Sequence, residues 1–216
     1  MSTRTITYHL GTIPEGARPQ SVTANPIIIG GREALRVTLT DDATKGEPNV
    51  DFIDMPTFLM IPGDFKNGTI SVDLYSKLRE DAPAYARGFA GLAYRISDSG
   101  DVFEAVYLRP LNGLKTKPES PRDKRAVQYF AYPDWRFDRL RQEYSDGRFE
   151  SGANIGPAEW VNLTLEIDET HLTVFVDGAE CILLDKTKSA VTTGNIGLFV
   201  DIGTDAFFSE LRITQR

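Results

Sequence analysis

Residues 88–110 have the sequence GFAGLAYRISDSGDVFEAVYLRP, which is part of the most informative region of the chain. It contains two runs rich in apolar and aromatic residues, 88–96 and 101–109, and each run has the length of a β-strand. The Ser, Asp and Gly residues between them are typical of a turn. The stretch therefore predicts a pair of antiparallel strands joined by a short connection.

Similar runs recur along the rest of the chain, bounded by Gly, Pro, Asn and Asp. They read RTITYHL, SVTANPIII and EALRVTL before residue 67, and TISVDLYS, AVQYFAY, EWVNLTLEI, HLTVFVDG, NIGLFVDIG and FFSELRIT after it. Many short strands without crossover helices predict an all-β fold, an antiparallel β-sandwich or jelly roll. The 216 residues contain no linker or internal repeat, which predicts a single domain over residues 1–216.

The charge of the chain limits the classes of partner that we expect. The formal net charge is -7, so the overall field does not attract a nucleic acid backbone or an anionic membrane surface. The first residues, MSTRTITYHLGTIPEG, lack the apolar core of a signal peptide, and no later run approaches the roughly 20 apolar residues of a membrane span. We therefore expect a soluble, cytoplasmic protein with no nucleic acid and no membrane partner.

Two segments, 41–57 and 110–124, are expected to be long loops, which are often functional in compact domains. The second segment joins the two runs with the most polar residues, so we expect it to rim whatever these strands present. The first segment is acidic and contains Asp41, Asp42, Glu47, Asp51 and Asp54. No cofactor is expected, and this acidic loop leaves a structural calcium ion as an alternative to solvated loop charge.

Three polar residues, Glu104, Arg109 and Gln128, lie within or at the ends of runs that are otherwise apolar. A buried polar group must be paired, because leaving it unpaired costs about 1–3 kcal/mol. The partners can be other side chains of the sheet or a polyhydroxylated ligand that lies across one face. Strand alternation places Tyr107 and Arg109 on one face and Glu104 on the other, so one ligand reaches all three only across a bulge.

For each of these residues a structural role competes with a functional one. Glu104 is the best single candidate for acid or base catalysis if the protein is an enzyme, and its alternative is a salt bridge to Arg95 or Arg125. Tyr107 and Arg109 are candidate ligand-binding residues, and their alternative is sheet packing with a paired guanidinium group.

Four further candidates for ligand binding follow in the sequence. Gln128 can donate and accept hydrogen bonds, as a sugar hydroxyl requires, and its neighbour Tyr129 points the opposite way along the strand. Trp135 and Arg141 lie in the segment 133–150, in which aromatic residues alternate with Arg, Asp and Glu. Aromatic rings can stack on a sugar while charged groups bind its hydroxyls; the alternative is a loop held to the sheet by its aromatic residues.

The ordered series GFAGLAYR, FEAVYLRP, VQYFAYPDW, EWV, FVDG, GNIGLFVD and FFSELRIT resembles the concanavalin A-like lectin/glucanase superfamily, specifically its bacterial laminin-G-like and 3-keto-disaccharide hydrolase-like domains. The likeness covers about residues 65–214. It implies a jelly roll of two curved sheets whose concave sheet can hold a sugar. Its motif positions are Glu104, Tyr107, Arg109, Gln128 and Tyr129. The Glu-x-Asp-x-x-Glu motif of the laminarinase-like glycosidases is absent, which argues against retaining hydrolysis by that route.

Three functions are therefore considered. The first is binding of a carbohydrate or glycoside on the concave face, for which we expect a groove with polar groups. The second is an enzyme of the glycoside hydrolase or lyase type, for which we expect a closed pocket with a carboxylate of raised pKa. The third is a protein-interaction module, for which we expect an exposed apolar patch.

Overall fold

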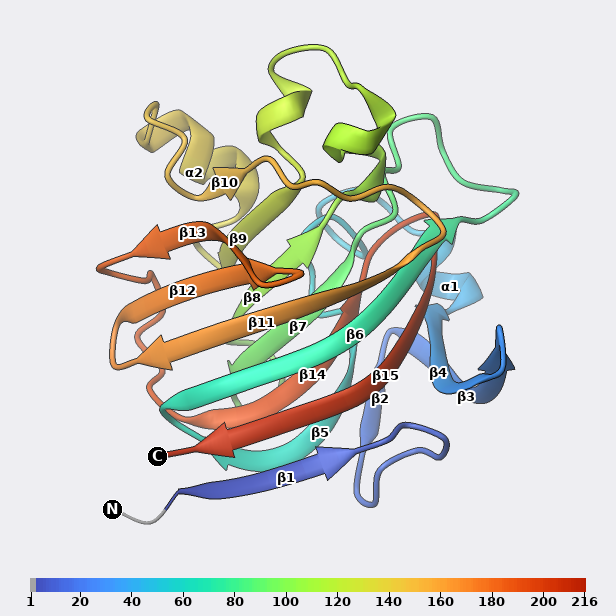
Figure 1. The fold of residues 1–216 in the computed structure, drawn as a ribbon, viewed down its shortest axis with the longest axis vertical. Coiled ribbons are helices and arrows are strands. Elements are labelled where there is room, and N and C mark those ends of the chain that lie inside the picture. Colours follow the sequence, from blue (N-terminus) through green and yellow to red (C-terminus); the bar gives the residue numbers. More distant parts are fainter. Residues whose placement is uncertain (1–2) are drawn as a thin grey trace.

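Two antiparallel β-sheets packed face to face form the protein in the computed structural model, which describes residues 3–216 (Figure 1). The eight-stranded sheet has the order β13 (Ala179–Leu184), β12 (His171–Val176), β11 (Trp160–Asp168), β6 (Gly68–Leu78), β15 (Thr204–Gln215), β4 (Arg32–Leu39) and β3 (Val22–Ile29), and β1 (Arg4–Tyr8) also pairs with β15. The seven-stranded sheet has the order β10 (Glu150–Ser151), β9 (Val127–Tyr132), β8 (Phe103–Leu108), β7 (Ala90–Ile96), β14 (Gly194–Val200), β5 (Phe58–Phe65) and β2 (Arg18–Gln20). The expected antiparallel sandwich is confirmed.

The helices are short and lie in the connections between strands. They are α1 (Asp41–Thr44), α2 (Phe137–Glu143) and the single 3₁₀ turns η1 (Pro110–Asn112), η2 (Leu114–Thr116) and η3 (Arg122–Lys124). In Figure 1, α2 and the 3₁₀ turns lie at the same end of the sandwich. Within residues 3–216, no helix is long and apolar enough to cross a membrane.

The structure contains elements that the sequence did not predict: the strands β2, β5 and β10, the helices α1 and α2, and the three 3₁₀ turns. The strand β5 was not predicted, because Pro62 and Gly63 interrupt its apolar run. The ladder between β5 and β14 accommodates this interruption by a shift of register between Gly194 and Ile196. The helix α2 was not predicted either, because its seven residues are too few to establish a helical period.

The strand pair β7–β8 has the expected hairpin pairing, with Leu92 opposite Val106 and Tyr94 opposite Glu104. The face that carries Glu104 and Val106 points toward the eight-stranded sheet. The Tyr129 hydroxyl, which shares this face, accepts a hydrogen bond from the backbone N–H of Lys188, just past β13. This face forms the core between the sheets.

Aromatic side chains dominate the opposite, outer face of the seven-stranded sheet. Phe103, Phe130, Phe199 and Tyr107 form ring pairs with centroids 5.5–5.8 Å apart, and all four side chains are buried. Residues of the loop 41–57, of the segment before β7 and of the helix α2 lie on this side of the sheet, since they line a cavity together with Tyr107. The outer face is therefore covered around these four buried rings, and a cavity remains beside Tyr107.

Candidate functional site

The cavity on the outer face of the seven-stranded sheet has a volume of about 230 Å³. Residues of the loop 41–57, the segment before β7, the end of β8, the connection 110–125, the helix α2 and the end of β14 line it. Both long loops predicted from the sequence therefore contribute to its walls. The connection 110–125 lies beside the end of β8, as the prediction that it rims these strands requires.

Tyr107 and Arg109 project from the end of β8 into this cavity. The Nη2 atom of Arg109 donates to the Tyr107 hydroxyl at 2.9 Å and to Oε1 of Gln128 at 3.1 Å, and its Nη1 atom donates to Oε1 of Glu150 at 2.9 Å. The Arg109 side chain is only 6% exposed. Burial opposes the charge of Arg109, but Tyr107 and Glu150 hold its pKa above the usual value. The guanidinium group is thus charged and rigidly placed.

Glu150, in the short strand β10, is shared by three arginines. Besides Arg109, it accepts from Nε of Arg141 at 2.8 Å and lies 3.6 Å from Nε of Arg125. Burial disfavours its charge, but the hydrogen bonds and charges of Arg141 and Arg109 outweigh this and lower the pKa of Glu150. The single negative charge of Glu150 therefore balances only part of the positive charge of these three arginines.

Asp201 and Asp54 provide the acidic part of the cavity. Asp201, at the end of β14, accepts from the backbone N–H groups of Ile53 and Asp54 at 3.0 Å and of Ile202 at 2.7 Å. Asp54 accepts in turn from the backbone N–H of Phe137 at 2.8 Å, at the first residue of α2. Asp201 thus attaches the loop 41–57 to the sheet, and Asp54 attaches α2 to that loop.

One oxygen of Asp54 accepts no hydrogen bond from the described part of the chain. The Oδ1 atoms of Asp54 and Asn112 are buried and accept no hydrogen bond from residues 3–216, although both side chains line the cavity. Burial, and next to it the charge of Asp201, raises the pKa of Asp54 from 3.8 to about 7. The cavity therefore presents buried acceptors and a carboxyl group that holds its proton over part of the neutral range.

Aromatic rings form the apolar part of the wall. Phe89 packs edge-on against Tyr107 with a centroid distance of 5.9 Å. The guanidinium groups of Arg109 and Arg141 lie 5.6 Å and 4.7 Å from the centre of the Phe137 ring. Tyr85 is 48% exposed at the solvent side of the cavity. The cavity combines flat apolar faces with fixed charges, a combination that is common in small-molecule sites.

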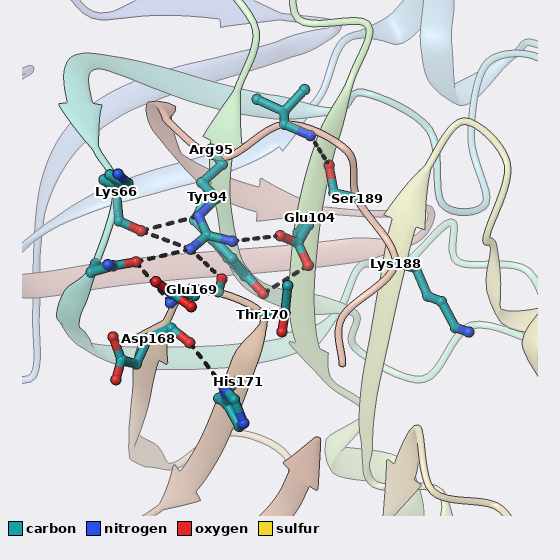
Figure 2. A network of polar contacts seen from close by, with 12 residues as sticks. Lys66, Tyr94, Arg95, Glu104, Asp168, Glu169, Thr170, His171, Lys188 and Ser189 are labelled. Carbon is teal, nitrogen blue, oxygen red and sulfur yellow. Dashed lines mark hydrogen bonds and ion pairs between the residues drawn. The ribbon is translucent and has the colours of Figure 1, made fainter. Parts of the chain in front are cut away.

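Glu104 does not line this cavity. It is fully buried between the sheets, where it accepts from the Tyr129 hydroxyl at 2.6 Å, the Tyr94 hydroxyl at 3.3 Å and Nη1 of Arg95 at 3.2 Å. Figure 2 shows that Arg95 also reaches the backbone carbonyl groups of Lys66 and Glu169. Burial raises the pKa of Glu104, against the effect of Tyr129 and Arg95. The salt bridge to Arg95, considered from the sequence, is present.

The other four candidates from the sequence lie in four different places. Arg141 lines the cavity with Tyr107 and Arg109. Gln128 lies behind Arg109, where its Nε2 atom donates to backbone carbonyl groups at 2.6 Å and 3.2 Å. Tyr129 joins the network of Glu104 between the sheets. Trp135 lies outside the cavity, under the side chains of Arg139 and Lys188, whose cationic groups are 4.1 Å and 4.6 Å from its ring centre.

Several residues of the cavity had no individual signal in the sequence. Asp54 stood out only as part of the acidic loop, and Asp201, Arg87 and Arg122 did not stand out at all. Asp54 and Asp201 are 147 positions apart, and no spacing rule links them. In the described part of the chain, which includes the acidic loop, three or more His, Cys, Asp or Glu side chains nowhere form a group that could hold a metal ion.

No protein-family model and no curated protein sequence matches the chain. Solved structures do match. The carbohydrate-binding module CBM66 from Bacillus subtilis aligns with a TM-score of 0.56 and 13% identity, over 90% of this chain and 96% of that one. A Bacillus subtilis protein of unknown function with a galectin-like fold aligns with a TM-score of 0.58 and 12% identity, over 97% and 94%. At this identity the likeness shows the fold alone.

Proposed function

Because the chain has the concanavalin A-like lectin/glucanase fold, we propose that it binds a carbohydrate in the cavity on the outer face of its seven-stranded sheet. The observation that carries this proposal is the pair of buried acceptor atoms, Oδ1 of Asp54 and Oδ1 of Asn112, which no donor of residues 3–216 satisfies. An unsatisfied buried acceptor costs about 1–3 kcal/mol. Sugar hydroxyl groups are donors, so a bound sugar whose hydroxyl groups reach these two atoms removes this cost.

The rest of the wall supports the same class of ligand. The Tyr107 hydroxyl accepts from Arg109, and its own proton is available to the neighbouring Asp54 carboxyl group or to a ligand acceptor. Burial raises the pKa of Tyr107 well above its usual value, so the phenol keeps this proton. The volume of about 230 Å³ is below the roughly 300–1,000 Å³ of sites for drug-sized ligands, which favours a ligand of about one sugar ring.

Titration calorimetry against neutral hexoses, pentoses and their glycosides tests the proposal. We expect at least one sugar to bind, and we expect Tyr85→Ala to weaken it about tenfold, because an exposed aromatic face at the cavity is lost. The matched control is Tyr75→Ala. Tyr75 is a half-buried aromatic residue on the outer face of the other sheet, where it packs against Trp160.

The two variants also distinguish a sugar site in the cavity from a sugar site on the eight-stranded sheet. If Tyr75→Ala abolishes binding and Tyr85→Ala does not, the sugar site lies on the eight-stranded sheet and the proposed location is wrong. If no sugar binds to the unmodified protein, the proposed function is wrong.

The raised pKa of Asp54 favours a second candidate function, an enzyme that acts on a glycoside. A carboxyl group with a pKa of about 7 can both donate and accept a proton at neutral pH, as general acid–base catalysis requires. Asp201 is less suited to this role, because backbone N–H groups occupy both of its carboxylate oxygens. Product analysis of each bound glycoside with wild type and Asp54→Asn separates the functions: turnover that Asp54→Asn abolishes supports the enzyme.

A further inference from the structure

We propose that the sugar bound in the cavity carries an anionic oxygen group, a carboxylate or a sulfate or phosphate ester, which Arg87 and Arg122 bind on the solvent side of the cavity. This inference rests on the proposed function, because it specifies the class of sugar. It starts from the number and pairing of the charged side chains around the cavity.

Five arginines line the cavity: Arg87, Arg109, Arg122, Arg125 and Arg141. Arg109, Arg125 and Arg141 all form their ion pairs with Glu150. Neither Arg87 nor Arg122 forms an ion pair with any carboxylate of residues 3–216. The acidic residues of the cavity interact with Arg109 and form no ion pair with Arg87 or Arg122: Asp201 accepts from the backbone of the loop 41–57, and burial raises the pKa of Asp54 to about 7.

Arg87 is held in place before any ligand arrives. Its Nη1 atom donates to the backbone carbonyl groups of Ala84 at 2.8 Å and Ala86 at 2.7 Å. These bonds occupy one end of the guanidinium group and leave Nη2 without a protein acceptor among the described residues. A guanidinium edge that is fixed and unpaired suits an oxyanion, which accepts from two of its N–H groups at once.

In the absence of a ligand, the positive charges of the arginines around the cavity repel one another. Burial lowers the pKa of Arg87, and the charges of Arg122 and Arg109 lower it further. Burial also lowers the pKa of Arg125, together with the charge of Arg141. A ligand with a negative group relieves this repulsion, whereas a neutral sugar leaves it in place.

The positive cavity contrasts with the charge of the whole chain. The formal net charge is -7, with 31 acidic against 24 basic residues. A cluster of arginines with so few carboxylates is therefore not a consequence of a basic composition. The net charge of the chain argues against a nucleic acid or an anionic membrane as partner, and a small anionic ligand at a locally positive cavity is compatible with it.

Paired sugars that differ only in the anionic group test the inference. The probes are glucose, galactose and fructose, the uronates of the first two, and the 6-phosphates and 6-sulfates of the hexoses, with inorganic phosphate and sulfate alone. Calorimetry is carried out with wild type, Arg87→Gln and Arg122→Gln. We expect an anionic sugar to bind at least tenfold more tightly than its neutral counterpart, and each variant to remove most of this difference. We also expect the affinity to fall as NaCl is raised.

The matched control is Arg212→Gln, which changes the net charge equally but removes an exposed arginine of β15 on the other sheet. Arg122 is exposed, so Arg122→Gln tests the site even if Arg87→Gln impairs folding. The uronates, sulfates and phosphates distinguish the possible sources of the anionic group. An equal loss of affinity in Arg212→Gln would attribute the effect to net charge and overturn the inference.

The outcomes also separate the two proposals. If only neutral sugars bind and Arg87→Gln and Arg122→Gln leave their affinity unchanged, the inference is wrong and the proposed function stands. If inorganic phosphate binds through Arg87 and Arg122 while no sugar binds, the anion site stands and the proposed function is wrong. If none of the probes binds, both are wrong.

Discussion

Asp54 is an interior carboxyl group whose protonation is linked to folding. Its pKa is about 7 in the folded protein and 3.8 in the unfolded reference, so between about pH 4 and pH 7 the folded state holds a proton that the unfolded state has released. The contribution of Asp54 to stability therefore falls as the pH rises through this window and is least favourable above about pH 7. The shift corresponds to an upper limit on the order of 4 kcal/mol.

We expect Asp54→Asn to remove this dependence. Below about pH 4 the variant and wild type should have similar free energies of unfolding, and toward pH 7.5 the variant should become the more stable protein. Urea unfolding at several pH values measures this difference. The control is Asp101→Asn. Hydrogen bonds from Ser99 and Ser97 lower the pKa of Asp101, so its stabilising effect is present above about pH 4 and is lost as the pH falls. A constant difference between Asp54→Asn and wild type would show that the Asp54 pKa is not raised.

Glu104 and Arg95 form a buried ion pair, with side-chain exposures of 0% and 3%. Replacing Glu104 by Gln keeps the shape but leaves the Arg95 charge without a carboxylate, so we expect a loss of stability on the order of 3 kcal/mol. Because Glu104 lies away from the cavity, sugar binding at a temperature where the variant is folded should be unchanged. Denaturant unfolding and calorimetry on Glu104→Gln measure the two effects. Normal stability with lost binding or turnover would instead support a functional role for Glu104.

At the scale of elements, the loop 41–57 depends on attachment to the sheet. Ile53 and Asp54 both have positive φ angles, 70° and 54°, a conformation that is unfavourable for a β-branched residue such as Ile53. Hydrogen bonds from this turn to Asp201 offset the strain. The same turn supports α2 through the bond from the Phe137 N–H to Asp54. The carboxylate of Asp201, just after β14, therefore holds this turn directly and supports α2 through Asp54.

We expect Asp201→Asn to loosen this wall without unfolding the sandwich, because the amide oxygen replaces only one of the two accepting oxygens. The lost charged hydrogen bonds are worth about 1.5–3 kcal/mol each, so amide hydrogen exchange should rise strongly in residues 46–57 and in α2. Mass spectrometry of peptides from these segments and from β6 and β11 measures the change. The control is Asp205→Asn, which removes an ion pair with Arg36 on the other sheet. Equal exchange in both variants would contradict this role of Asp201.

For the molecule as a whole, local sequence patterns predicted the strands and the alternation of their side chains. They could not predict contacts between residues that are far apart in the sequence. Alternation correctly separated Glu104 from Tyr107 and Arg109, because side chains alternate along any extended strand. It did not reveal which face meets the other sheet, since both faces of β8 are buried. The pairing of Asp54 with Asp201 required the meeting of a loop and a strand end, which depends on the whole topology.

The surroundings of Trp135 have an optical consequence. The chain contains only two tryptophans, and they belong to different halves of the sandwich. Trp135 precedes α2 beneath Arg139 and Lys188, and Trp160 begins β11 with the Arg32 guanidinium 4.4 Å from its ring centre. Each layer therefore contains one tryptophan with cations close to its ring. In a variant that keeps Trp135 and replaces Trp160, the intrinsic fluorescence reports on the layer beside the cavity, and the reverse variant reports on the opposite sheet.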